Sequence, residues 1–572
     1  MRIATSVLVI TTLFIPSHEE GYGTVVADHT TEVGYYGAVE DFVSDFVPGV
    51  NTDTDNIVTL KKIQNEGGQE EEEEEEGTVL RLLKKKKSNK KNSKTEKKPT
   101  RKPTRKPASS PTTDPPTATP PLSDGELTFP EEMYAGDGRF VVTMDYADYK
   151  TVAVEQFTTR LFGGIMPGKT VIVYPGEVLE ITFKNNLVLQ PNSVQGPEKN
   201  NTFGIPDTTN LHFHGGHISG EEPSDDIYIH VRPGGRTYEY TSAFPSDHMP
   251  GTELSNFFAS LARDEIFKLV PNPEITSGDF RLVNGKYRPN LTIIPGNWYR
   301  FRTIYAGWEA EALDLKIVSA ENDSYRPCET ILLAKDGIYI KDYPRSIELF
   351  PIPAGGRADI MVRCPTEGSF IVKHFEIEED LLTIESVLPA GQTEVIIAPG
   401  PTIGFEWDFP AYLTDLQEEP PFPGCSCNTE MATVGPTSPP LFTLNDRLFK
   451  EDSYVHTVRF GDVAERTLSN LKGHAYHQHV YPFQLQSGYE NDTTSENGYW
   501  KNGDWQDTIK SKNQDVAVMK YRPATFPGKI MLHCHILPHE DLGMMSQERV
   551  VFRNDTSNPN CTCDYTYDYI QI

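Results

Sequence analysis

The strongest constraint on the fold is a short run near the C-terminus that places a cysteine between two histidines. Its metal-binding side chains are His533, Cys534, His535, His539 and Met544. In an extended strand alternate side chains point to opposite faces, so His533 and His535 share one face and Cys534 takes the other. Thiolate, imidazole and thioether are soft ligands that favour copper. The run predicts a copper-binding strand; the alternative is a buried free cysteine among core histidines.

Two further histidine clusters add to this run. One contains His474, His477 and His479, and the other, far upstream, contains His212 and His214. A blue-copper site needs one cysteine, two histidines and a weak axial methionine, and His474 supplies the second imidazole that the first run lacks. The paired histidines are two residues apart, so each pair faces one way along a strand. The clusters therefore predict a blue copper with further copper beside it.

The chain resembles the multicopper oxidases, the family of laccases, ferroxidases and cuprous oxidases. The resemblance runs from residue 130 to 555 and is most specific at the His474 and His533 clusters. The other matching stretches are Pro167–Thr170, Tyr174–Glu177, His212–His214, Asn284-Gly285, Pro295-Gly296 and Gly503–Thr508. It implies an all-β fold of three cupredoxin-like β-sandwich domains. It also implies a blue copper in the last domain and a three-copper cluster between the first and last domains.

The resemblance implies a ligand set for four coppers. These ligands are His474, Cys534, His539 and Met544 for the type 1 (blue) copper, His212 and His477 for type 2, and His214, His479, His533 and His535 for the type 3 pair. The implied reaction passes electrons from a small reducing substrate, a phenol or a metal ion, to dioxygen.

Several other polar residues lie near these motifs. The resemblance implies that Glu540 and Asp541 deliver protons; the alternative is a pair of exposed carboxylates in a turn. We expect Asp225 and Asp226 to be solvated surface residues. We expect His217 and His230 to be ordinary histidines without a metal.

The family's second His-x-His pair has no counterpart here. The turn that precedes it is present over Ser246–Thr252, but the next histidine after His248 is His374. His248 matches a histidine that is not a ligand, so the first domain is expected to be incomplete at its end. Three explanations remain open: a splicing or gene-prediction product that skips this segment, a natural variant that cannot fully reduce dioxygen, or ligands from another chain or from unrecognised positions.

Hydrophobic periodicity predicts how the chain is divided. Beyond Phe129, short runs with period-two alternation are broken by proline and glycine, and long amphipathic helices are scarce, which indicates β-sandwiches. We expect a signal peptide over 1–18, a disordered low-complexity stalk over 19–128, domains over 129–265, 266–405 and 425–556, and a tail over 557–572. The stalk holds acidic and basic blocks and proline repeats, which cannot bury enough apolar surface to fold.

The N-terminus and the cysteines predict export. The apolar stretch Ile3–Ile15 reads as a secretory signal, with an uncleaved signal anchor as the alternative, and no later run reaches transmembrane length. Apart from Cys534 there are six cysteines, and bridges from Cys425/Cys427 to Cys561/Cys563 would tie the start of the last domain to its tail. Six Asn-x-Ser/Thr sequons are candidate glycosylation sites if the chain is exported. We expect a secreted, extracellular or wall-associated protein.

The net charge of −29 excludes nucleic acid as a general partner. An acidic body attracts cations, which mildly favours Fe(II) or Cu(I) over a phenol as the reductant. The basic part of the stalk could contact a polyanion such as an acidic wall polysaccharide, or it is a plain solvated linker. A non-catalytic blue-copper electron-transfer or copper-binding protein remains the alternative to an oxidase.

Overall fold

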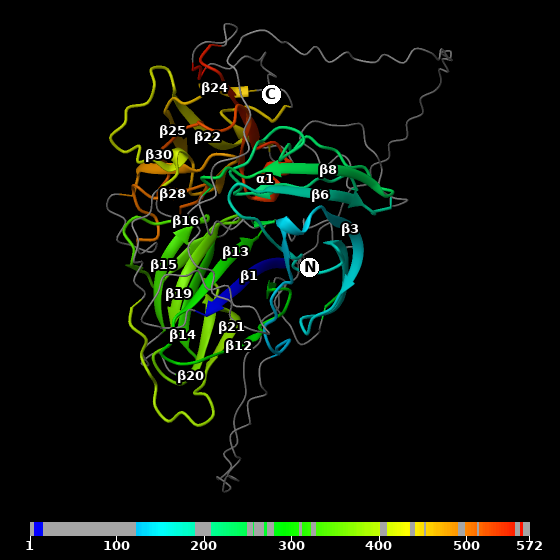
Figure 1. The fold of residues 1–572 in the computed structure, drawn as a ribbon, viewed down its shortest axis with the longest axis vertical. Coiled ribbons are helices and arrows are strands. Elements are labelled where there is room, and N and C mark those ends of the chain that lie inside the picture. The colour runs from blue at the N-terminus through cyan, green and yellow to red at the C-terminus, as the bar shows by residue number, and fades with distance from the viewer. Residues whose placement is uncertain are drawn as a thin grey trace, which may run out of the picture. The chain divides into compact units, whose positions relative to one another are not determined.

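The computed structural model shows a chain built almost entirely of β-strands (Figure 1). It describes residues 5–14, 122–188, 207–248, 255–256, 268–271, 280–307, 312–321, 328–400, 409–434, 441–450, 454–489, 498–511, 514–554 and 561–563. Among the residues just given, helix is confined to η1 (Ala135–Asp137), η2 (Ala411–Leu413) and α1 (Leu537–Asp541). The predicted all-β class is confirmed. The expected stalk as far as residue 121 lies outside the described residues.

The first domain is built on one five-stranded sheet of order β10-β4-β3-β6-β8. Two short two-stranded sheets, β2-β5 and β7-β9, accompany it. Its strands are β2 (Glu132–Tyr134), β3 (Phe140–Tyr149), β4 (Val154–Phe162), β5 (Thr170–Ile172), β6 (Val178–Asn185), β7 (Phe213–His214), β8 (Arg236–Ala243), β9 (Ser255–Asn256) and β10 (Lys268–Pro271). Along β6 every second residue is buried, as expected for a strand with one face on a core.

The middle domain is a sandwich of two sheets. Their orders are β11-β1-β13-β19-β15-β16, with β17 paired to β15, and β12-β21-β20-β14-β18. The strands are β11 (Phe280–Val283), β12 (Asn290–Ile293), β13 (Tyr299–Ala306), β14 (Leu313–Ser319), β15 (Glu329–Lys335), β16 (Ile338–Tyr339), β17 (Arg345–Ser346), β18 (Phe350–Ile352), β19 (Arg357–Arg363), β20 (Gly368–His374) and β21 (Glu379–Ser386). The Cys328–Cys364 disulfide joins the start of β15 to the end of β19.

One strand of this sandwich comes from the N-terminus of the chain. β1 (Thr5–Phe14) lies between β11, to which it is parallel, and β13, to which it is antiparallel. The signal peptide expected over 1–18 covers this strand and stays a prediction. Within the described residues, every helix is too short or too polar to cross a membrane.

The last domain is a second two-sheet sandwich, with orders β23-β22-β25-β30-β27-β28 and β24-β32-β31-β26-β29. Its strands are β22 (Ser426–Val434), β23 (Leu441–Leu444), β24 (Tyr454–Arg459), β25 (Ala464–Ser469), β26 (Tyr476–Gln478), β27 (Phe483–Ser487), β28 (Trp505–Gln506), β29 (Thr508–Ile509), β30 (Val516–Tyr521), β31 (Gly528–Cys534) and β32 (Met545–Val551). Disulfides Cys425–Cys561 and Cys427–Cys563 join the start of this domain to its tail, as expected, and fix the connectivity that the spacing left open.

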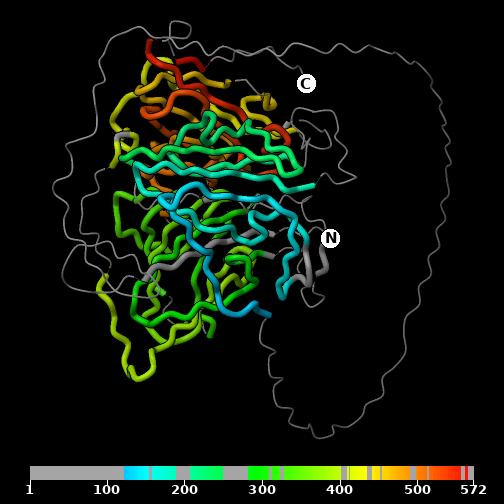
Figure 2. The backbone as a smooth tube through the Cα atoms, turned by 45° about the vertical axis from the view of Figure 1, so that its right-hand side comes forward, coloured from blue at the N-terminus to red at the C-terminus, as the bar shows by residue number. Residues whose placement is uncertain are grey.

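Segments from the first and last domains lie side by side although they are far apart in the sequence (Figure 2). The His217 imidazole contacts the carbonyl oxygen of Val480 at 2.8 Å, and the Lys529 ammonium contacts Asp226 at 2.6 Å. These contacts bring β7, which carries His214, against β26 and β31 of the last domain. The three predicted histidine clusters therefore meet in one region.

Candidate metal centre

Three of the four predicted blue-copper ligands, His474, Cys534 and His539, come together in the last domain. The thiol sulfur of Cys534, at the end of β31, lies 3.7 Å from Nδ1 of His474 and 3.7 Å from Nδ1 of His539. The two Nδ1 atoms are 3.0 Å apart, so the three ligand atoms form a compact triangle. Met544 is fully buried, and its carbonyl accepts a hydrogen bond from the Cys534 amide at 3.0 Å. This thiolate, imidazole and thioether set fits copper.

Burial sets the protonation of these ligands in the absence of a metal. It raises the pKa of the Cys534 thiol to about 12, and it lowers the pKa of His474 to about 4 and that of His539 to about 3. The imidazoles therefore keep a free lone pair at neutral pH. The thiol, in contrast, loses its proton only when a cation binds to the sulfur. The site is chemically prepared for a thiophilic metal.

The remaining histidines form a second cluster on the opposite side of β31. β26 and β31 are antiparallel, with His477 paired to His533 and Tyr476 to Cys534. Ligand atoms lie within 4.8 Å of one another in two overlapping trios, His212/His214/His477 and His477/His479/His533. The ring of His535 lies 4.9 Å from that of His214, between centroids. Imidazoles from the first and last domains thus converge on one buried space.

Several buried ring nitrogens in this cluster make no hydrogen bond within the described part of the chain, and those of His212 and His477 are among them. Nε2 of His212 and Nε2 of His477 are both buried and make no hydrogen bond. Buried polar atoms normally have a partner, so unpaired lone pairs that converge indicate a site for a ligand. These are the two residues predicted to bind the type 2 copper. The donor set fits a metal that prefers imidazole nitrogen.

The other nitrogen of each ring determines which atom faces the metal. Nδ1 of His477 lies 3.0 Å from the carbonyl oxygen of Asp507, and Nδ1 of His212 lies 2.9 Å from the Asp225 carboxylate. Carbonyls and carboxylates only accept hydrogen bonds, so each Nδ1 carries the proton and Nε2 presents the lone pair. Both rings therefore have the tautomer that metal binding through Nε2 requires.

The last domain carries the sequence likeness to a known family. Residues 426–552, which contain the blue-copper residues and two of the three histidine clusters, match the sequence profile described as Multicopper oxidase. Over these residues the last domain is similar to the multicopper oxidases. No curated protein sequence matches the chain.

Solved multicopper oxidase structures share the fold over about three quarters of the chain. A Campylobacter jejuni multicopper oxidase described as a metallo-oxidase is 18% identical, with a TM-score of 0.50, over 75% of this chain and 94% of that one. McoA of Aquifex aeolicus is 17% identical, with a TM-score of 0.53, over 75% of this chain and 100% of that one. The laccase-like CueO of Ochrobactrum sp. is 15% identical, with a TM-score of 0.53 and the same coverage. At these identities the likeness concerns the fold.

The expectation for Asp225 and Asp226 was wrong. They are 4% and 5% exposed, because β31 of the last domain covers the loop that carries them. Asp225 accepts hydrogen bonds from the His212 ring and from the Phe213 amide at 2.9 Å, so it orients a predicted copper ligand. The only sequence signal was a carboxylate shortly after a His-x-His pair, and burial by a distant domain has no local signal.

Glu540 and Asp541, the predicted proton donors, have different environments. Oε2 of Glu540 lies 3.2 Å from Nδ1 of His533. Burial alone would raise the pKa of Glu540, but the adjacent His533 lowers it overall, while Glu540 raises the pKa of His533. Asp541 is exposed. The structure therefore brings Glu540 to the buried histidine cluster and leaves Asp541 at the surface.

The histidines expected to be ordinary follow that expectation where the structure tests it. His217 uses both ring nitrogens for protein contacts, with the Val480 carbonyl at 2.8 Å and the Thr525 hydroxyl at 2.9 Å, and it stacks on Tyr412. It has no lone pair left for a metal. His230 is exposed.

β7, which carries His214, is paired with a short strand that follows the predicted turn. β9 pairs with β7, with Ser255 opposite His214 and Asn256 opposite Phe213. The sequence contains no histidine between His248 and His374. The strand that lies against the first histidine pair therefore offers no imidazole. Residues 249–254, which include the end of the predicted turn, lie outside the described residues.

Proposed function

We propose that the protein is a copper-dependent oxidoreductase that oxidises phenols or metal ions, Fe(II) or Cu(I), by one-electron steps and reduces dioxygen to water. The observation that carries the proposal is the Cys534, His474 and His539 triangle, joined through the backbone to two histidines of the buried cluster. The family match of the last domain supports it. The related structures described as a metallo-oxidase and as a lignin-model oxidase support both reductant classes.

The chain provides a short connection between its two proposed copper sites. Copper held at both sites would supply the one-electron redox chemistry. Cys534 ligates on one face of β31, and its covalent neighbours His533 and His535 point into the cluster on the other face, with ring centroids 5.5 Å apart. With copper bound at both sites, Cys534 and its neighbours His533 and His535 would connect the blue site to the cluster through one or two residues. Electron entry and dioxygen reduction are separated, so a reductant need not approach the oxygen site.

Dioxygen reduction also consumes protons, and Glu540 is placed to deliver them. Glu540→Gln keeps the shape of the side chain and removes the carboxylate that can take up a proton and pass it on. We expect dioxygen uptake to fall by about 10²- to 10⁴-fold, the usual contribution of a positioned acid, with the blue absorption unchanged. Steady-state oxygen consumption measures this effect. Asp541→Asn is the matched control, because Asp541 is exposed; equal losses in both variants would contradict the role of Glu540.

A second candidate function is a non-catalytic blue-copper protein that binds copper or transfers electrons. The observation that favours it is the absence of histidine from β9 at the position opposite His214. Each type 3 copper would then lack one imidazole, and a bridged pair would be held weakly. Sequencing the transcript across residues 252–254 tests whether a segment carrying two histidines has been skipped.

An oxygen electrode tests the proposed function directly. Copper-loaded protein should consume dioxygen when a phenol, Fe(II) or Cu(I) is added, and the reductant with the highest kcat/KM identifies the class. Blue protein that is reduced by these compounds without consuming dioxygen would contradict the oxidase and support the electron-transfer alternative. The three disulfides suit an oxidising compartment, which supports the proposed secreted or wall-associated location.

A further inference from the structure

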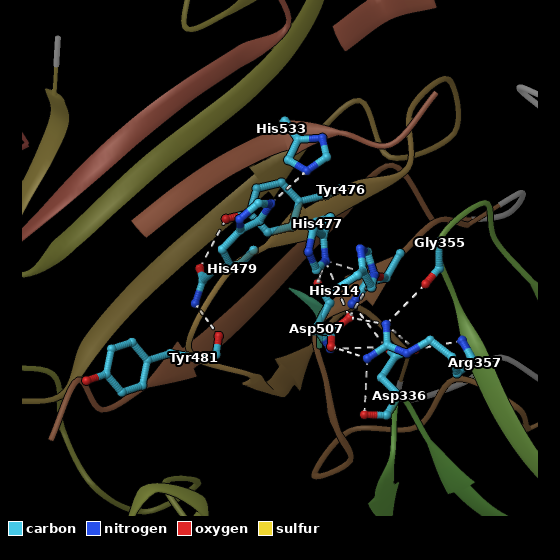
Figure 3. Close-up of polar contacts among 12 residues, drawn as sticks. His214, Asp336, Gly355, Arg357, Tyr476, His477, His479, Tyr481, Asp507 and His533 are labelled. Atoms are coloured by element: carbon cyan, nitrogen blue, oxygen red, sulfur yellow. Dashed lines mark hydrogen bonds and ion pairs between the residues drawn. The ribbon is translucent and has the colours of Figure 1, made fainter. Parts of the chain in front are cut away.

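The middle domain supplies no predicted copper ligand, yet it contacts the cluster directly (Figure 3). A Cβ atom on Gly355, which has φ +82°, would lie 2.6 Å from the His535 ring. A Cβ atom on Gly215, which follows His214 and has φ +83°, would lie 2.9 Å from the guanidinium carbon of Arg357. Both close approaches need glycine, so the turn before β19 packs against ligand-bearing segments of the first and last domains.

Arg357, the first residue of β19, binds the segment that orients His477. Its guanidinium, with 1% of the residue exposed, donates to both carboxylate oxygens of Asp507, with 2.7 Å between Nη1 and Oδ1. Oδ1 of Asp507 lies 3.4 Å from Nδ1 of His477, and the Asp507 carbonyl is the 3.0 Å partner of the same nitrogen. A bidentate arginine fixes a carboxylate in both position and orientation.

Asp336 holds the same segment from a second side. It lies in the β15–β16 turn, where Asp336 and Gly337 have φ of 48° and 76°, a conformation that Asp-Gly pairs favour. Its Oδ2 accepts the backbone amides of Asp507 and Thr508, both at 3.0 Å, and its Oδ1 accepts the Arg357 amide at 2.9 Å. The hydroxyl of Thr508 is 3.0 Å from Nδ1 of His477. Both partners of the His477 ring are thus fixed by the middle domain.

We propose that Arg357 and Asp336 are positioning residues for the type 2 copper. They hold Asp507 and Thr508, which in turn keep the proton of His477 on Nδ1 and direct Nε2 into the cluster. This inference rests on the proposed function, because it concerns a copper ligand of that site. It gives the middle domain a role in copper binding beyond connecting its neighbours.

The chain contains a matched control for this arrangement. Arg345 also binds a last-domain carboxylate with both nitrogens, at 2.7 and 2.8 Å to Asp504. Asp504 lies three residues before Asp507, on the same segment. No contact of Arg345 involves a predicted copper ligand among the described residues. Arg357→Lys and Arg345→Lys therefore break the same kind of interdomain bond at different distances from the cluster.

The test is copper binding by Arg357→Lys, Asp336→Asn and Arg345→Lys in the full chain. We expect the first two to bind type 2 copper about 10- to 100-fold more weakly, the usual effect of losing a residue that orients a metal ligand. The type 2 electron paramagnetic resonance signal measures this, and the blue absorption reports that the last domain is folded. Arg345→Lys should retain the wild-type type 2 affinity.

The other possible results distinguish a failure of this inference from a failure of the proposed function. A wild-type type 2 signal in both Arg357→Lys and Asp336→Asn would overturn the inference and leave the proposed function intact. Equal weakening in Arg345→Lys would also overturn it, because the effect would then belong to the interface in general. If Arg357→Lys fails to fold, the isosteric Asp336→Asn decides alone. A wild-type protein with a blue band but no type 2 signal would contradict the proposed function itself.

Discussion

Cys534→Ser should lose the blue absorption band, which thiolate-to-copper charge transfer places at roughly 600 nm. Oxygen uptake driven by any reductant should fall to the rate of copper-free protein. The reason is that the Cys534 sulfur is both the thiolate of the predicted type 1 site, 3.7 Å from each Nδ1, and the covalent link to His533 and His535. Removing it deletes the electron entry and the connection together. Absorption spectroscopy and an oxygen electrode measure the two effects.

Met544→Leu is the matched control for this variant. It removes only the weak axial thioether and keeps the thiolate and both imidazoles, so the blue band should remain. The reduction potential should shift, because the axial ligand tunes it. A blue band that survives Cys534→Ser would contradict the assignment of Cys534 as the copper thiolate.

Arg466→Met should destabilise the last domain by about 3–5 kcal/mol, the usual cost of removing one partner of a buried ion pair. Arg466 and Glu548 are each 1% exposed or less, and the guanidinium also bonds Gln478 at 2.7 Å and the Tyr521 hydroxyl at 3.1 Å. Methionine fills similar space but leaves the Glu548 carboxylate buried without its cation. Because Arg466 supports β26, which carries His477, the loss should also weaken copper retention. Chemical unfolding of the copper-free protein measures the stability change.

Lys501→Ala provides the comparison for Arg466→Met. Lys501 pairs with Asp342 at the surface, where its side chain is 53% exposed, and such pairs contribute about 0–1 kcal/mol. The two variants thus separate a buried ion pair from an exposed one. A stability change below about 1 kcal/mol for Arg466→Met would show that the buried network is not important for the domain.

Short sequence patterns predicted much of this molecule because strand alternation depends mainly on residues that are neighbours in the chain. The alternation around Cys534 predicted that His533 and His535 share a face, and their ring centroids lie 5.5 Å apart at the end of β31. The Cys-x-Cys pairs at both ends of the last domain predicted two disulfides. What the sequence could not predict are contacts between domains. Nothing near Arg357 in the sequence indicates that it binds Asp507, 150 residues away.

The burial of Asp225 is a second case in which a contact between domains could not be predicted from the local sequence. Its loop is polar and locally resembles a solvated turn, so the sequence predicted exposure. The carboxylate is buried because the last domain packs over it and because it accepts bonds from the His212 ring and the Phe213 amide. Long-range packing reversed a local expectation at a functional residue, where such departures are expected.

The most direct test of the account is the electron paramagnetic resonance spectrum of the copper-loaded chain, recorded together with its dioxygen consumption. The account predicts type 1 and type 2 copper signals in the same protein, with dioxygen consumed when a reductant is added. A type 1 signal alone, without dioxygen consumption, would contradict it. That result would leave a blue-copper protein with the oxidase fold and no working dioxygen site.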